Sequence, residues 1–145
     1  MRVTYIKTKD TKFDVPEYNI EADKFLNKFA GKFTVSKGMF IIIDTITDDI
    51  TEYIIFADEI DTETFLSIFI KFDLLIEVKD ITLEVKSNKC ELPLFIKSFQ
   101  SEDSEFNSVC ELEDYLELHL SSDDILEKIS IYGIDTLTEK DKMLL

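Results

Sequence analysis

The most apolar stretch of the chain, residues 65–78, changes its hydrophobic period near the middle. Its sequence is FLSIFIKFDLLIEV. The apolar residues of the first half share one face at 100° per residue: Phe65, Ile68, Phe69 and Phe72. From residue 74 the period is two, which is typical of a strand. The pattern predicts a helix that begins in the acidic segment 58–64, where Asp58 or Asp61 can cap it, ends near Asp73 and leads into β structure. One continuous helix to Ile81 is the alternative.

The period of two continues beyond this stretch. Three apolar residues alternate with three polar ones: Ile81, Leu83 and Val85 with Thr82, Glu84 and Lys86. We therefore expect strand structure over 74–86, in which Lys79-Asp80 is either the turn of a hairpin or a bulge in one long strand.

A second β region precedes the helix. Residues 39–46 and 50–56 are rich in β-branched and aromatic side chains, and the short polar segment Thr47-Asp48-Asp49 separates them. This arrangement predicts an antiparallel hairpin over 39–56. The continuous apolar run 39–43 indicates a strand that is central or covered on both faces.

The N-terminal region has weaker patterns. Residues 3–6 predict a short first strand, and the polar residues 7–12 predict a loop. Residues 33–35 have an extended pattern. We expect a helix over 17–30, with Gly31 at its C-terminal cap.

Three segments follow the predicted strand region 74–86. Residues 92–99 fit either a helix or a strand, and 100–107 have the composition of a disordered loop. Residues 109–120 fit both periods, but their leucine and glutamate content favours a helix.

The last segment, residues 122–145, predicts two helices with a glycine hinge between them. Ser121-Ser122-Asp123-Asp124 is typical of a helix start, and apolar residues follow at helical spacing. Gly133 is placed to end the first helix, and Thr136 or Thr138 is placed to cap the second.

This tail resembles a short module found at the C-termini of many Bacteroidota proteins, including some rhomboid-type membrane proteins. The matching positions are Ile125-Leu126, Lys128-Ile129-Ser130, Gly133-Ile134-Asp135-Thr136-Leu137-Thr138 and Glu139-Lys140. The resemblance covers about the last sixth of the chain. It implies a bacterial origin and carries no activity. Residues 1–120 resemble no family.

Together these elements predict a single α+β domain. Its antiparallel sheet includes the hairpin 39–56 and the strand or strands over 74–86, with helices on one face. The core domain is expected over 1–121, with the helical hairpin 122–145 packed on it or attached to it. At 145 residues, with 12 Phe and no Trp, the chain is long enough to bury a core without disulfides or a metal.

Charge is the most distinctive part of the composition. The net charge is −15; residues 1–40 carry +3, whereas residues 41–145 carry −18. Such a field repels nucleic-acid phosphate and anionic lipid, so no nucleic-acid or membrane partner is expected. It favours encounter with a basic protein, although solubility alone also explains a surplus of acids.

Three acidic clusters are candidates for contact with such a partner. The predicted partner-binding residues are Asp44, Asp48, Asp49, Glu52, Asp58, Glu59, Glu102, Asp103 and Glu105. None of the clusters has the glycine and the alternating oxygen ligands of a calcium loop, so no metal is expected. The sequence also lacks nucleotide-binding and zinc-protease motifs, and we expect no cofactor.

Few residues are candidates for catalysis. His119 lies among acids that would raise its pKa if they were close in space, but no nucleophile accompanies it. Cys90 and Cys110 lack metal-binding spacing, and they form a disulfide only if the fold brings them together. The sequence MRVTYIKTKDTKF at the start lacks the apolar run of a signal peptide, so we expect a cytoplasmic protein.

Three function classes therefore remain. The favoured hypothesis is a non-enzymatic binding or regulatory protein that engages a basic protein, as an immunity protein, an inhibitor or a nucleic-acid mimic does. The alternatives are a small carboxylate- or metal-dependent enzyme and a homo-oligomeric structural module.

Overall fold

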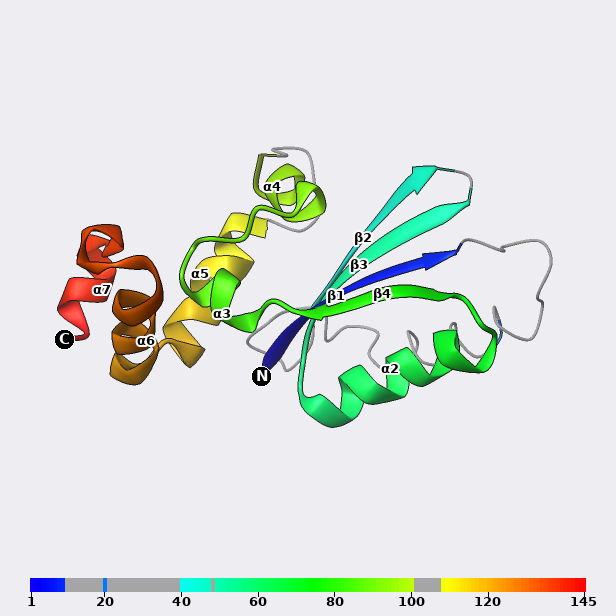
Figure 1. The fold of residues 1–145 in the computed structure, drawn as a ribbon, viewed down its shortest axis with the longest axis horizontal. Coiled ribbons are helices and arrows are strands. Elements are labelled where there is room, and N and C mark those ends of the chain that lie inside the picture. Colours follow the sequence, from blue (N-terminus) through cyan, green and yellow to red (C-terminus); the bar gives the residue numbers. More distant parts are fainter. Residues whose placement is uncertain (10–19, 21–39, 48, 101–107) are drawn as a thin grey trace.

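The computed structural model describes residues 1–9, 20, 40–47, 49–100 and 108–145. They form an α+β domain with a four-stranded antiparallel sheet in the order β2-β3-β1-β4 (Figure 1). The strands are β1 (Arg2–Lys9), β2 (Phe40–Thr47), β3 (Ile50–Ala57) and β4 (Leu75–Asp80). The helices are α2 (Glu59–Lys71), α3 (Thr82–Lys86), α4 (Pro93–Gln100), α5 (Ser108–His119), α6 (Ser122–Tyr132) and α7 (Glu139–Met143), with a 3₁₀ helix, η2 (Ile134–Thr136). The predicted α+β class is confirmed.

Some predictions fall outside the described residues. They are the extended segment 33–35, the loop 101–107 and, except for Ile20, which is helical, the helix over 17–30. Gln100, which was expected in that loop, belongs to α4.

Helices cover both faces of the sheet, whereas the sequence led us to expect them on one face. The cluster on the α2 side contains Ile6, Ile55, Ala57, Phe65, Ile68, Phe69 and Leu74. The cluster on the opposite side contains Val3, Tyr5, Ile54, Phe56, Ile81, Val85, Leu94, Phe95, Tyr115 and Leu116. The reason is that β1 and β3 are apolar at consecutive positions, and consecutive side chains point to opposite faces.

The predicted junction within residues 65–78 is confirmed. Asp58 caps α2 by accepting a hydrogen bond from the Asp61 N–H at 2.7 Å. The helix ends at Lys71, and Asp73 takes a left-handed backbone conformation with φ of 54°. Aspartate tolerates this conformation better than most residues. The chain then enters β4, and the alternative of one helix to residue 81 is wrong.

The hairpin predicted over 39–56 is also confirmed, since β2 and β3 pair antiparallel from Phe40↔Phe56 to Thr47↔Ile50. β1 pairs with β3 along its whole length, from Arg2↔Ala57 to Lys9↔Ile50. Residues 7–9 therefore lie in a strand, not in the loop that their polarity suggested, because backbone pairing with β3 does not require apolar side chains.

The prediction of strand structure to residue 86 is wrong beyond Asp80. The ladder continues for one more bond, in which the Ile81 N–H donates to the Val3 carbonyl at 2.9 Å, and the helix α3 then begins. Ile81 and Val85 are four residues apart, so the same apolar positions fit a helix face as well as a strand face. Both side chains are buried.

The C-terminal half forms the helical end of the molecule. Residues 92–99, which fitted two periods, belong to the helix α4, and the helix favoured over 109–120 is confirmed as α5. In Figure 1, α5 leads from the sheet towards α6 and α7, which lie at the far end of the long axis.

The predicted helical hairpin of the tail is confirmed. Ser121 caps α6, and Gly133 ends it with φ of 91°, a conformation that strains any residue with a side chain. Thr138, not Thr136, caps α7. The ion pair of Lys128 and Asp141 joins the two helices, with 2.6 Å between Nζ and Oδ2.

Candidate functional site

The acids predicted to face a partner do not form one site. Asp49 lies in the turn between β2 and β3, whereas Asp58 and Glu59 lie at the start of α2, beyond the other end of β3. β3 has eight residues, so its two ends are roughly 25 Å apart. Four of the predicted acids lie outside the described residues: Asp48, Glu102, Asp103 and Glu105.

Glu52 was predicted to contact a partner on the surface. Its side chain is instead buried, at 7% exposure. It lies opposite Asp44 of β2, whose side chain is not among those described, and it is hydrogen-bonded to the Tyr5 hydroxyl. Burial and this carboxylate raise the pKa of Tyr5. The even-numbered residues of β3 point to the face where α3 to α5 pack, so the Glu52 side chain lies on a core-facing side of the sheet.

An acidic concavity that the sequence did not indicate lies between α3 and α6. It has a volume of about 420 Å³. Its lining residues are Asp80, Thr82, Leu83, Glu84, Lys86, Asp124 and Glu127. We call it the acidic junction, because four carboxylates and one ammonium group give it a formal charge of −3.

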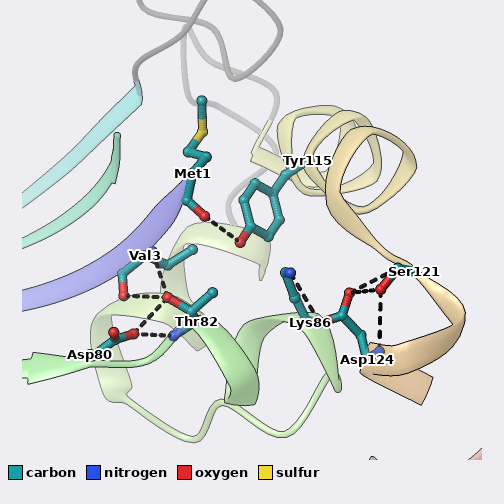
Figure 2. A network of polar contacts seen from close by, with 8 residues as sticks. All are labelled: Met1, Val3, Asp80, Thr82, Lys86, Tyr115, Ser121 and Asp124. Carbon is teal, nitrogen blue, oxygen red and sulfur yellow. Dashed lines mark hydrogen bonds and ion pairs between the residues drawn. The ribbon is translucent and has the colours of Figure 1, made fainter. Parts of the chain in front are cut away.

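The α3 wall of the acidic junction is tied to the sheet (Figure 2). The Thr82 hydroxyl accepts a hydrogen bond from the Val3 N–H at 2.9 Å, and it lies 2.6 Å from the Asp80 Oδ1. The Thr82 N–H also donates to this carboxylate oxygen at 3.0 Å. These bonds fix Asp80 and the start of α3 against β1.

The α6 wall is held by a capping box. The Asp124 Oδ2 accepts hydrogen bonds from the N–H and the hydroxyl of Ser121, both at 2.8 Å. The other oxygen, Oδ1, receives the Lys86 ammonium at 3.1 Å, so an ion pair bridges α3 and α6 (Figure 2). Desolvation alone raises the pKa of Asp124, but the bonds from Ser121 and Lys86 outweigh it and hold the pKa below its usual value.

The arrangement suits a cationic group better than a metal ion. Among the residues that the structure describes, no three His, Cys, Asp or Glu side chains are placed to hold a metal. Carboxylates around a concave surface can receive an ammonium or guanidinium group through charge-assisted hydrogen bonds.

The sequence does not indicate the acidic junction, and the reason is physical. Asp80 and Glu84 are about 40 residues away from Asp124 and Glu127 in the chain. Residues 82–86 were expected to form a strand, and the Ser121–Asp124 segment indicated only a helix start. No local pattern reports that α3 and α6 meet.

A second, smaller concavity contains Cys90. Its volume is about 250 Å³, and its lining residues are Lys79, Ile81, Glu84, Lys89, Cys90, Glu91 and Leu92. Cys90 is a free thiol, and burial raises its pKa. A protonated thiol is a poor nucleophile, so this cysteine has the properties of a small packing residue.

His119 differs from the expectation that nearby acids raise its pKa. The imidazole packs against the Tyr115 ring, with 4.8 Å between the centroids, and it lines neither of the two concavities. Burial lowers its pKa, and the N-terminal amino group and Lys86 lower it further, against a smaller opposite effect of Asp124. The residue is therefore neutral at pH 7.

We expect His119 to make the protein less stable as the pH falls below the ordinary histidine value of about 6.5. The unfolded chain binds this proton more readily than the folded chain, so protonation favours unfolding. The measurement is the free energy of unfolding in urea between about pH 7 and pH 5, where His119→Gln should flatten the dependence. Equal slopes for the two proteins would contradict it. The carboxylates of Asp124 and Asp141, whose pKa values are also lowered, act in a more acidic range.

No helix within the described ranges is long and apolar enough to cross a membrane. Comparisons with protein-family models, curated proteins and solved structures found no match for this chain. The function is therefore inferred from the geometry and charge of the molecule itself.

Proposed function

We propose that this protein is a non-enzymatic binding or regulatory protein whose acidic surface engages a basic protein partner. The observation that carries the proposal is the net charge of −15, with −18 in residues 41–145. The predicted partner-facing acids at Asp49, Asp58 and Glu59 are exposed, which supports the proposal.

We propose the acidic junction as the site of this contact. A lysine or arginine side chain of the partner would enter the concavity and meet Glu84 and Glu127. Lys86 would not oppose it strongly, because its ammonium is already neutralised by Asp124. The capping bonds and the ion pair keep the two walls in place, so little ordering is needed when the partner binds.

The mechanism would have two steps. The negative field accelerates the encounter and orients the partner, and this effect weakens as salt screens the charges. Apolar contacts then slow dissociation, and α6 carries exposed apolar side chains at Leu126 and Ile131 for that purpose. We propose that this encounter takes place in the cytoplasm, where a free thiol such as Cys90 stays reduced.

The experiment begins with affinity capture from the native cell at low salt and purification of the retained basic protein. We expect its association constant to fall steeply as ionic strength rises, because the attraction is between opposite net charges. Binding that is insensitive to salt would overturn the proposal, as would a retained partner that is not basic.

A matched pair of variants locates the contact. Glu84→Gln with Glu127→Gln changes the acidic junction, and Glu113→Gln with Glu117→Gln makes the same charge change on the exposed side of α5. We expect the first pair to weaken binding by up to about tenfold and the second by much less. Equal effects would contradict the assignment to the junction, while the salt dependence still tests the proposed function.

Among the described residues, no contact at the acidic junction, Cys90 or His119 favours a carboxylate- or metal-dependent enzyme or a homo-oligomeric structural module. The enzyme hypothesis requires a titrating group beside carboxylates in a concave site, and the pKa shifts of His119 and Cys90 both favour the neutral form.

A further inference from the structure

The outer side of β4 carries backbone groups that pair with no other strand among the described residues. β4 is the last strand in the order β2-β3-β1-β4 (Figure 1). All residues from Ile76 to Asp80 are exposed. An edge strand with open N–H and C=O groups is a template for pairing with a strand of another molecule.

The direction of each backbone group follows from the ladder with β1. The Ile81 N–H donates to the Val3 carbonyl at 2.9 Å, so residue 81 directs its backbone towards β1. In an antiparallel ladder this direction alternates along the strand. Glu77 and Lys79 therefore also point their N–H and C=O groups inward. Val78, between them, points both of its groups outward.

The side chains of β4 alternate between the two faces of the sheet. Val78 lies opposite Ile6 in the register and so shares the α2 face of the sheet. Ile76 and Val78 are 46% and 40% exposed. Glu77 and Lys79 have opposite charges and project from the other face. The ion pair of Lys79 with Glu84, at 3.6 Å, is partly exposed and holds the lysine only weakly.

We infer that β4 pairs antiparallel with β4 of a second copy of this chain, about a two-fold axis through Val78. Val78 then exchanges two hydrogen bonds with its own counterpart. Glu77 faces Lys79 of the second copy, and Lys79 faces Glu77 of the second copy. An axis through residue 77 or residue 79 would set like charges against each other, which is destabilising. The charge pattern thus selects the register about Val78.

This pairing produces an eight-stranded sheet with β4 strands at its centre and α2 of both copies on the same side. The contact is small, so the dimer is weak. The net charge of −15 on each copy opposes it, and we expect dimerisation to strengthen as moderate salt screens this repulsion. A basic partner responds to salt in the opposite direction, and this inference does not depend on the proposed function.

The first test is sedimentation equilibrium of the full chain over a concentration series at low and moderate salt. We expect a monomer–dimer equilibrium that Val78→Pro weakens by about tenfold or more, because proline removes the outward N–H. The pairing of β4 with β1 does not use this N–H, and circular dichroism checks that the variant folds. A wild-type chain that is monomeric throughout, or a dimer that Val78→Pro leaves unchanged, would overturn the inference.

The second test uses charge complementation. Glu77→Lys alone places lysines opposite lysines, and Lys79→Glu alone places glutamates opposite glutamates, so each variant should be monomeric where the wild type dimerises. A mixture of the two should dimerise, because every facing pair is again of opposite charge. A mixture that stays monomeric while the wild type dimerises would exclude this register.

Discussion

Replacing Phe69 by alanine is expected to reduce the free energy of unfolding by about 3–5 kcal/mol, a large part of the stability of a small domain. Phe69 is fully buried in α2, and its ring lies 4.9 Å from the Phe65 ring and 5.3 Å from the Tyr53 ring, measured between centroids. The substitution leaves a cavity between the helix and the sheet, and the aromatic contacts around it are lost. Urea unfolding followed by circular dichroism measures the change.

The control is the next residue, because Ile70 lies on the same helix with 62% of its surface exposed. Ile70→Ala should change the stability by less than about 0.5 kcal/mol. If the two variants were equally stable, Phe69 would not be packed in the core between α2 and the sheet.

Replacing Lys128 by methionine is expected to destabilise the packing of α7 on α6 by about 3–5 kcal/mol. Lys128 and Asp141 have side chains only 2% and 3% exposed, so the substitution leaves a buried carboxylate without its cation. Desolvation raises the pKa of Asp141, and hydrogen bonds from Lys128 and Thr138 outweigh this effect in the intact protein. Without Lys128 the carboxylate is forced to take up a proton or to return to water.

The effect should be local. α7 has five residues, too few for a stable isolated helix. We therefore expect amide hydrogen exchange to accelerate over residues 138–143, while protection in β1 and β3 is retained.

Lys142→Met is the matched control, in α7. Lys142 and Glu139 also form an ion pair, at 2.7 Å, but their side chains are 55% and 88% exposed. This pair should contribute less than about 0.5 kcal/mol. Faster exchange over 138–143 in both variants to the same extent would mean that burial does not set the strength of the Lys128–Asp141 pair.

Local chemistry in the sequence was sufficient to predict the elements whose ends are set by neighbouring residues. The change of period at Asp73, the hairpin over 39–56 and the start of α6 at Ser121 all depend on groups within a few positions of each other. The resemblance of the tail to a module of Bacteroidota proteins stays a prediction, although the helix, glycine and helix that it implies are present.

The structure corrected the predictions where one pattern suited two environments. The alternation over 81–86 fits a strand or a helix. In the folded chain this segment is helical, and its first residue, Thr82, is hydrogen-bonded to Val3, 79 residues away in the chain. Glu52 has the polarity of a surface residue, but its strand position turns it towards the core.

Composition and short-range periodicity are sufficient to predict the α+β class, the net charge and the positions of most helices and strands. The folded structure was needed to show three further features: helices cover both sheet faces, α3 and α6 meet to form the acidic junction, and β4 lies at an edge with the backbone groups of Val78 turned outward. Each of these depends on contacts between residues tens of positions apart, which short-range periodicity does not report.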